Sequence, residues 1–163
     1  MLGEVIRHYR SGDHDAIVAL SLRAWAPVFA SIEAVLGAEL ARRLHGEDWR
    51  TFQAAAVSDT VTSSENRTWV AEVDERVAGF VVATTADAER RIGEIAMLAV
   101  DPAAQRRGLG RALTDHATAY LRDAGMRVAV IGTGGDPGHA PARALYVRAG
   151  YGLMPAAQYF KVL

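Results

Sequence analysis

The amino-acid sequence predicts one α+β domain built on a mixed β-sheet. Its length of 163 residues suits a single domain covering residues 1–163. Residues 13–66 carry apolar side chains mainly at helical spacing, whereas residues 68–85 hold two β-rich runs around Asp74-Glu75-Arg76, as in a hairpin. Strand-like and helix-like patterns alternate after that, so a sheet with helices packed against it is the expected architecture.

The N-terminal third is expected to be mainly helical. EVIRHYR (residues 4–10) predicts a short strand, and Asp13 behind it is a residue type that caps helix N-termini. Apolar residues then recur at helical spacing until Pro27 perturbs the pattern. Two more helices are expected over residues 31–45 and 48–63.

The C-terminal half should supply the rest of the sheet. GEIAMLAV (residues 93–100) and MRVAVIGT (126–133) are apolar enough for strands covered on both faces. Between them a helix begins after residue 108 and stops at Gly125. A further helix over residues 140–150 and one or two strands over 151–163 complete the predicted order.

Composition excludes several classes of protein. Eighteen basic and 19 acidic residues give a net charge of −1, which does not favour a nucleic-acid or acidic-membrane partner. The N-terminus lacks the apolar core of a signal peptide, and no stretch approaches the roughly 18 uncharged apolar residues of a membrane span. We therefore expect a soluble, cytoplasmic protein.

Residues 105–113, QRRGLGRAL, predict a site for an anion. Gly108 and Gly110 stand where an apolar strand gives way to a helix, whose first amides lack internal partners and carry partial positive charge. Glycine lets a ligand approach such amides closely, which suits a phosphate. The alternative is a tight turn that happens to be basic. Side-chain donors surround the turn: Gln105, Arg106, Arg107 and Arg111.

LAVDPAAQRRGLGRAL (residues 98–113) resembles the acyl-CoA-binding motif Q/R-x-x-G-x-G/A of the GCN5-related N-acetyltransferases (GNAT family). The resemblance implies a layered α/β/α fold with a mixed, mostly antiparallel central sheet, and acetyl-CoA as co-substrate. It also implies that the loop amides hold the pyrophosphate and that the strand end pairs with the pantetheine arm. The residues matched to these two roles are Gln105, Arg106, Arg107, Gly108, Leu109, Gly110 and Arg111, and Leu98, Ala99 and Val100.

HAPARALYVRAGY (residues 139–151) resembles the second signature of the family, a helix carrying A-x-x-L-Y. By this resemblance Tyr146 binds the cofactor and protonates the departing thiolate, and Glu94 is the general base. Many family members have asparagine where this chain has His139, so His139 is expected to contact the cofactor. It could also share the proton transfer, as could a chain of waters.

Other chemistry is less favoured. The chain has no cysteine and no G-x-S-x-G motif for an acyl-enzyme, and its histidines lack metal-ligand spacing, so direct acetyl transfer without a metal is expected. A dinucleotide site at VAVIGTGGDPG (residues 128–138) is rejected because Pro137 stands at the third glycine position. A noncatalytic acyl-CoA sensor and an adaptor acting through residues 13–66 stay open.

The acceptor amine is not specified by the sequence. In the resembling family the first helices cover the acceptor site, and core packing is the default role for the aromatic residues of this region. They could instead wall a pocket, with an acidic residue receiving a cation. The residues concerned are Trp25, Phe29, Trp49, Phe52, Glu33, Glu47 and Asp48. A homodimer, formed through an edge or C-terminal strand, is a further expectation from the resemblance.

Overall fold

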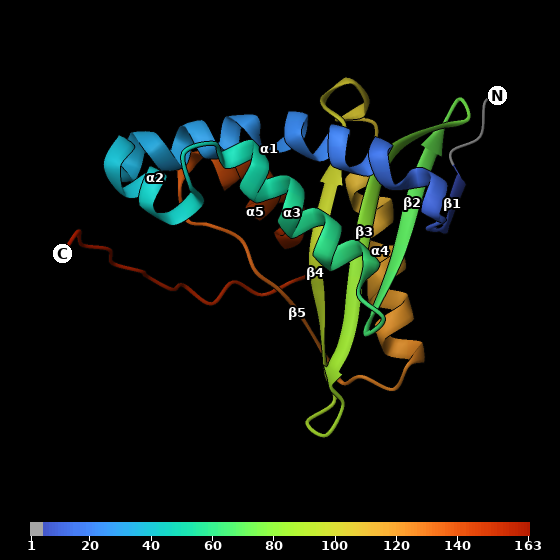
Figure 1. Cartoon of the computed structure of the whole chain (residues 1–163). Helices are drawn as coiled ribbons and strands as arrows, with labels where there is room; N and C mark the ends of the chain where they lie inside the picture. The colour runs from blue at the N-terminus through green and yellow to red at the C-terminus, as the bar shows by residue number, and fades with distance from the viewer. Residues whose placement is uncertain (1–4) are drawn as a thin grey trace.

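The structure, a computed structural model, describes residues 5–163 and shows a five-stranded sheet with helices on both faces (Figure 1). The strands are β1 Val5–His8, β2 Asn66–Val73, β3 Arg76–Asp87, β4 Ile92–Val100 and β5 Val128–Ile131. The helices are α1 His14–Leu36, α2 Ala38–His45, α3 Trp49–Thr62, α4 Leu109–Asp123 and α5 Ala140–Arg148. Of the predicted first strand, Glu4 lies outside the described residues.

The sheet is mixed, as predicted. Its strands follow the order β1-β2-β3-β4-β5, and only the last pair, β4 with β5, is parallel. Helix α4 makes the crossover that a parallel pair requires. Asp74 and Glu75, both with positive φ, form the two-residue turn between β2 and β3, which matches the predicted hairpin.

Two apolar clusters hold the layers together. On one face, Leu109, Leu113 and Leu121 of α4 pack against Val81 and Ile95 of the sheet. On the other face, α1 and α3 cover the sheet with a second cluster (Figure 1). Its fully buried members are Ile17, Leu20, Val57, Val70, Phe80 and Val82. Successive buried residues of β2 and β3 belong alternately to the two clusters, as expected for strands that are covered on both faces.

Helix α1 continues through Pro27, so the predicted interruption there is wrong. Proline removes one amide from the helix but does not prevent the tertiary contacts that hold the flanking turns, such as buried Leu20 and Phe29. The break lies at Gly37, whose φ of 84° is favourable only for glycine. Because Gly37 separates α1 from α2, the two helices of the N-terminal layer can fold back on each other.

The segment Ser11–Leu36 is long and apolar enough to cross a membrane by length and composition, with a mean hydropathy of 1.4. In this fold it packs on the sheet instead: Ile17 and Leu20 are fully buried against β2 and β3 residues. Arg23 in its middle forms an ion pair with Asp101 at the end of β4. The helix therefore packs with one side on the sheet, as helices of layered domains do.

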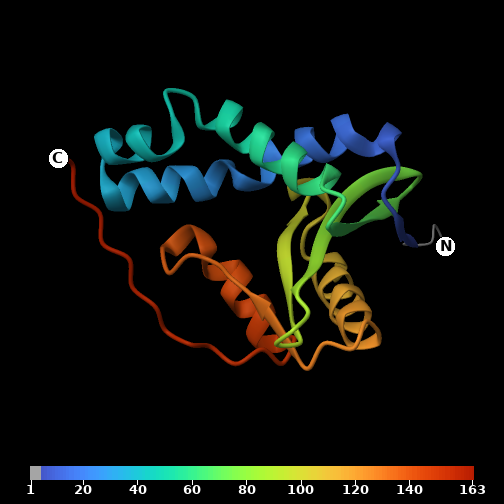
Figure 2. The same cartoon turned by 60° about the horizontal axis from the view of Figure 1, so that its bottom comes forward.

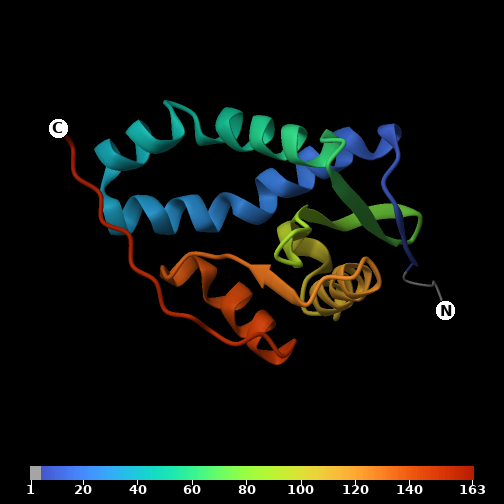
Figure 3. The same ribbon diagram turned by 90° about the horizontal axis from the view of Figure 1, so that it is seen from below.

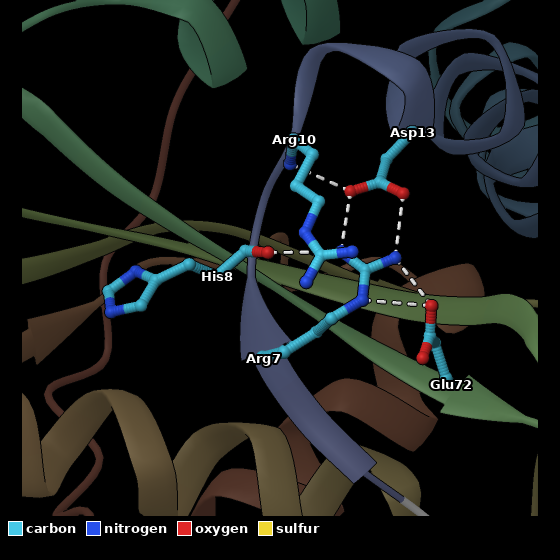
Figure 4. A network of polar contacts seen from close by, with 5 residues as sticks. All are labelled: Arg7, His8, Arg10, Asp13 and Glu72. Carbon is cyan, nitrogen blue, oxygen red and sulfur yellow. Dashed lines mark hydrogen bonds and ion pairs between the residues drawn. The ribbon is translucent and has the colours of Figure 1, made fainter.

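Asp13 does not cap α1 through its side chain, contrary to the prediction. Its carboxylate instead accepts two hydrogen bonds from Arg7 of β1, both 2.8 Å, and one of 2.7 Å from the Arg10 amide (Figure 4). Arg7 also donates through Nε to Glu72 of β2 at 2.8 Å. The hydrogen bond from Arg7 keeps the pKa of Asp13 below its usual 3.8, although partial burial opposes the shift. This network fastens the first strand to the start of α1.

We predict that Arg7→Met destabilises the fold by about 3 kcal/mol at pH 7, because buried Asp13 and partly buried Glu72 lose their partner. The pKa of Asp13 is lower in the folded chain, so its contribution is present above pH 3.8 and is lost as the pH falls further. Urea unfolding should therefore show a smaller effect of Arg7→Met at pH 2.5 than at pH 7. Exposed Arg76→Met is the control, and an equal loss at both pH values would contradict the prediction.

The end of the chain differs from the prediction. Residues 152–163 form no strand; they leave the body as an extended, exposed segment (Figures 2 and 3). Strand β5 is consequently the edge of the sheet, and Val128 and Val130 are exposed rather than buried. Both predictions rested on apolar residues alone. Formation of a strand also needs a hydrogen-bonding partner, and within residues 5–163 the segment 152–163 has none.

Candidate functional site

A cavity of about 870 Å³ opens where β4 and β5 part. The two strands pair from Ile92 with Val128 to Ile95 with Ile131, where β5 ends, while β4 runs on to Val100. The walls come from α1, from the loop between β4 and α4, from the segment after β5, and from α5. The cavity thus lies at the carboxyl end of a parallel strand pair, a usual place for a ligand in such sheets.

A β-bulge aims the free edge of β4 into this cavity. Val82 pairs with Met97 and Ala83 with Ile95, so Ala96 has no partner in β3. The extra residue bends and twists the strand at the point where β5 ends. Within residues 5–163, backbone groups of residues 97–99 on the side away from β3 have no strand partner and are therefore available to an extended ligand. The expected pantetheine residues Leu98, Ala99 and Val100 all line the cavity.

The loop before α4 forms a concave surface of backbone amides. Arg106 and Gly108 have φ values of 60° and 90°, and α4 begins directly after them. Within residues 5–163, no hydrogen-bond acceptor pairs with the amides of residues 106–111. Left-handed residues beside a helix N-terminus create an anion-binding nest. A Cβ at Gly108 would meet nothing within 4 Å, so the space above the loop is open to a ligand.

Some side chains of the motif line the cavity, whereas others stabilise the loop or the core. Arg106 and Arg111 line the cavity, and Arg111 is held by Asp115 at 2.6 Å and by the carbonyl of Arg148 at 2.6 Å. Gln105 donates to the Val100 carbonyl at 3.1 Å and so braces the loop against β4. Arg107 is exposed outside the cavity lining, and Leu109 is buried in the core beneath α4. Leu109 can therefore offer a ligand only its amide.

Tyr146 of α5 also lines the cavity. Burial, followed by the nearby Tyr151, raises the pKa of its phenol to about 12. The Tyr151 ring centroid is 6.5 Å away, and the Tyr151 hydroxyl hydrogen-bonds Thr118 at 2.7 Å. Tyr146 is therefore a protonated hydroxyl at neutral pH, able to donate a hydrogen bond or a proton.

His139 lies in the same cavity, held by groups that the sequence did not single out. Its Nδ1 is bonded to Asp136, and Asp136 accepts further hydrogen bonds from Ser31 of α1 at 2.7 Å and from the Gly138 amide at 3.0 Å. The i, i+3 spacing of Asp136 and His139 around a predicted helix start was the signal that could have revealed the pair.

The two residues considered for the base lie in different surroundings. His139 is part of the cavity wall, whereas Glu94 is exposed on β4, opposite Thr84 and Val130, and lies outside the lining. Ile95, the next residue, does line the cavity. Of these two residues, His139 is therefore the one that a ligand inside the cavity would contact.

Of the N-terminal aromatic residues, only Trp25 lines the cavity. Phe29 is buried and stacks on Trp49, with centroids 4.4 Å apart, and His45 bridges Phe29 and Phe52. These rings join α1, α2 and α3 to one another. Among residues 5–163, no group of three or more His, Cys, Asp or Glu side chains could hold a metal ion.

Comparisons with known proteins agree with this geometry. Residues 34–151 match the model of the Acetyltransferase (GNAT) family. A mycothiol acetyltransferase of Actinosynnema mirum is 30% identical over 152 residues, which are 91% of this chain and 44% of that protein. The chain thus spans less than half the length of the curated relatives it matches.

Solved structures share the fold. A GNAT-family structure from Desulfovibrio desulfuricans superimposes with a TM-score of 0.67 at 21% identity, covering 94% of this chain and 87% of that one. An aminoglycoside N-acetyltransferase in complex with CoA gives 0.61 at 12% identity, covering 98% and 95%. With the matched family model spanning the bulged strand, the amide nest and the tyrosine helix, the chain belongs to the GNAT acetyltransferase family.

Proposed function

We propose that residues 1–163 act as an acetyltransferase domain that moves an acetyl group from acetyl-CoA to a primary amine in a ternary complex. The observation that carries the proposal is the continuity of the amide nest at residues 106–111 with the free edge of β4 in one cavity. A diphosphate fits the nest, and an extended amide-containing arm fits the strand edge. We also propose a cytoplasmic location.

Acetyl-CoA would contact backbone and side chains in turn. The free amides and the guanidinium groups of Arg106 and Arg111 would hold the diphosphate, with Arg107 adding long-range attraction from outside the cavity. Backbone groups of residues 98–100 would hydrogen-bond the pantetheine arm. Tyr146 and His139 lie on the wall formed by α5 and the turn before it, and we assign both to the acyl end.

The reaction needs a neutral amine and a proton for the leaving thiol. A lysine-like amine has a pKa of about 10.4, so its free base at pH 7 costs about 4.6 kcal/mol. A general base recovers part of this cost, and either Glu94 or His139 can serve, directly or through water. Tyr146, protonated because of its raised pKa, supplies the proton to the thiolate.

The test is release of free CoA thiol from acetyl-CoA in the presence of a panel of amines. The panel should include aminoglycosides, peptides with a free N-terminus and the deacetylated form of mycothiol, since relatives carry names that refer to these classes or to mycothiol. Saturable release with one class supports the enzyme and identifies its acceptor. Binding of acetyl-CoA without release for any amine or longer acyl donor would favour the alternative, a noncatalytic sensor.

We also propose that the chain forms a homodimer in which residues 152–163 of one copy pair with β5 of the other. Leu153, Met154 and Tyr159 of the segment are exposed, as are Val128 and Val130 of the unpaired strand edge. An exposed apolar strand edge and an exposed apolar segment in the same chain are templates for pairing between copies. Each copy has one exposed β5 edge and one exposed C-terminal segment, so a reciprocal exchange between two copies pairs both.

Val130→Lys and Met154→Lys should each convert the protein to a monomer. Size-exclusion chromatography with light scattering is expected to give twice the 17.5 kDa chain mass for the unchanged protein and one chain mass for either variant. Val35→Lys is the matched control, because Val35 is also an exposed apolar residue, with an exposure between those of Val130 and Met154, but lies on α1. A monomeric unchanged protein at 100 µM (about the upper range of such measurements) would refute the exchange.

A further inference from the structure

We infer that Asp136 and His139 form a carboxylate–imidazole dyad in which Asp136 orients His139 to act as the general base of acetyl transfer. The inference rests on the proposed function, and it replaces the strand glutamate, Glu94, as the group that accepts the proton. Its basis is a polar cluster of which Gly138 and His139 line the cavity, and which involves three elements: α1, the 3₁₀ turn Pro137–His139 and α5.

The two side chains are enclosed and mutually bonded. Their exposed fractions are 12% for Asp136 and 18% for His139, and one carboxylate oxygen of Asp136 is bonded to Nδ1 of His139. The second oxygen accepts from Ser31 Oγ at 2.7 Å and from the Gly138 amide at 3.0 Å. Ser31 Oγ also accepts from the Gly138 amide at 2.8 Å. Each carboxylate oxygen thus has its own fixed partners.

The surrounding loop has no room to place these groups differently. A Cβ at Gly134 would lie 2.5 Å from both Asp136 Oδ1 and His139 Nδ1, and one at Gly138 would lie 2.6 Å from the Ser31 Cβ. From α5, Arg143 donates to the carbonyls of Gly134 and Asp136 at 2.7 and 2.8 Å. A loop that is packed and hydrogen-bonded from both sides holds the imidazole in one orientation, as a catalytic group requires.

The bonding pattern determines which nitrogen is free. Burial raises the pKa of Asp136, but the hydrogen bonds from Ser31 and His139 outweigh it, so the pKa lies below its usual value and the carboxylate stays ionised. An ionised carboxylate accepts, hence Nδ1 carries the proton and Nε2 presents its lone pair. The same arrangement orients the imidazole in hydrolytic triads. Because His139 lines the cavity, Nε2 is the nitrogen available to a ligand there.

The proposed step balances without a further reagent. The amine nitrogen attacks the thioester carbonyl carbon, and the proton that the nitrogen loses passes to Nε2 of His139 as the C–N bond forms. The C–S bond then breaks, and Tyr146 protonates the sulfur. His139 releases its proton to restore Tyr146, directly or through solvent, leaving an amide and free CoA thiol. Asp136 keeps its charge throughout and stabilises the imidazolium, so it is a positioning residue.

Few charged groups could compete with Asp136 for control of His139. Within residues 5–163, the polar contact from α1 is the neutral Ser31, and α5 contributes Arg143 and the protonated Tyr146. Arg143 is engaged by the two carbonyls. Asp136 is the acid bonded to His139, so its removal takes away the group that fixes the orientation of the imidazole.

The experiment compares His139→Gln, Asp136→Asn and Glu94→Gln in thiol release at saturating acetyl-CoA and acceptor, over pH 5.5 to 9.5 (about the range in which histidine bases act). We expect kcat to fall about 100-fold in His139→Gln, with loss of the decline at acidic pH that the unchanged enzyme shows. Asp136→Asn should lower kcat about tenfold or more, because the imidazole loses its fixed orientation. Glu94→Gln should keep the decline at acidic pH, whatever its effect on kcat.

Two more readouts separate the dyad from structural damage and from failure of the proposed function. Added imidazole should restore His139→Ala activity at least about fivefold, and nitrogen NMR should show a proton on Nδ1 of His139 that Asp136→Asn removes or shifts. An active enzyme whose acidic decline persists in His139→Gln, or disappears in Glu94→Gln, overturns the dyad alone. An Nε2-protonated neutral tautomer also overturns it, whether or not the enzyme turns over. If the unchanged protein releases no thiol although His139 shows the Nδ1 tautomer, the proposed function is wrong, and the role of His139 as a base is wrong with it.

Discussion

Gly108→Asp is expected to weaken acetyl-CoA binding by about 100-fold or more, equivalent to about 2.8 kcal/mol. Gly108 has a φ of 90° and open space where its Cβ would be, so aspartate enters without a steric clash and places a negative charge at the nest. That charge repels a diphosphate and can occupy the free amides itself. Titration calorimetry with CoA measures the effect.

Two matched variants isolate the cause. Gly125→Asp makes the same substitution at the other end of α4, where Gly125 has a φ of 86° and equally open space. It should cost comparable stability, about 1 kcal/mol, and leave CoA binding unchanged. Gly108→Ala introduces the strain without the charge and should weaken binding much less than aspartate does. If Gly108→Asp binds CoA as the unchanged protein does while retaining its thermal unfolding transition, the nest does not hold the diphosphate.

Tyr146→Phe is expected to lower kcat about 100-fold, with KM for acetyl-CoA changed by less than about threefold. The substitution keeps the ring in the cavity wall and removes only the proton donor. Because the pKa of Tyr146 is raised to about 12, the phenol stays protonated up to strongly alkaline pH. Any fall in the rate between pH 8 and pH 10 (about the alkaline range of such assays) must therefore come from another group.

Tyr151→Phe serves as the control for Tyr146→Phe. Its ring centroid lies 6.5 Å from that of Tyr146, but its hydroxyl is bonded to Thr118 of α4. Loss of that hydrogen bond should cost about 1 kcal/mol of stability and leave kcat within about twofold. Steady-state thiol release at saturating acceptor distinguishes the two variants. Unchanged kcat in Tyr146→Phe would remove the tyrosine from the proposed chemistry.

Features that depend on neighbours in the chain were predictable from the sequence. The hairpin turn at Asp74-Glu75, the start of α4 at the glycine loop and the stop at Gly125 each follow from local backbone preferences. The loop conformation at residues 106–111 was predictable for the same reason: a strand, a left-handed glycine and a helix start are consecutive in the sequence. The mixed sheet followed once these elements were placed in order.

Features that depend on partners far away in the sequence could not be predicted in this way. Apolar residues at 126–133 and 151–163 indicate strand propensity, but whether a strand is buried or even formed depends on what pairs with it. Pro27 shows the opposite case, where packing of α1 overrides a local signal. The link from Asp136 to Ser31 joins groups 105 residues apart, so only the folded chain shows that His139 has a fixed orientation.

The bulge at Ala96 and the loop amides mean that the co-substrate would be gripped mostly by main-chain atoms. Because every residue has the same peptide group, side chains along this part of the chain can be substituted without loss of these main-chain contacts. Trp25, Val28 and Gln53 of α1 and α3 line the same cavity with side chains. Under the proposed function, substitutions at these positions would change the acceptor without altering the main-chain contacts to acetyl-CoA.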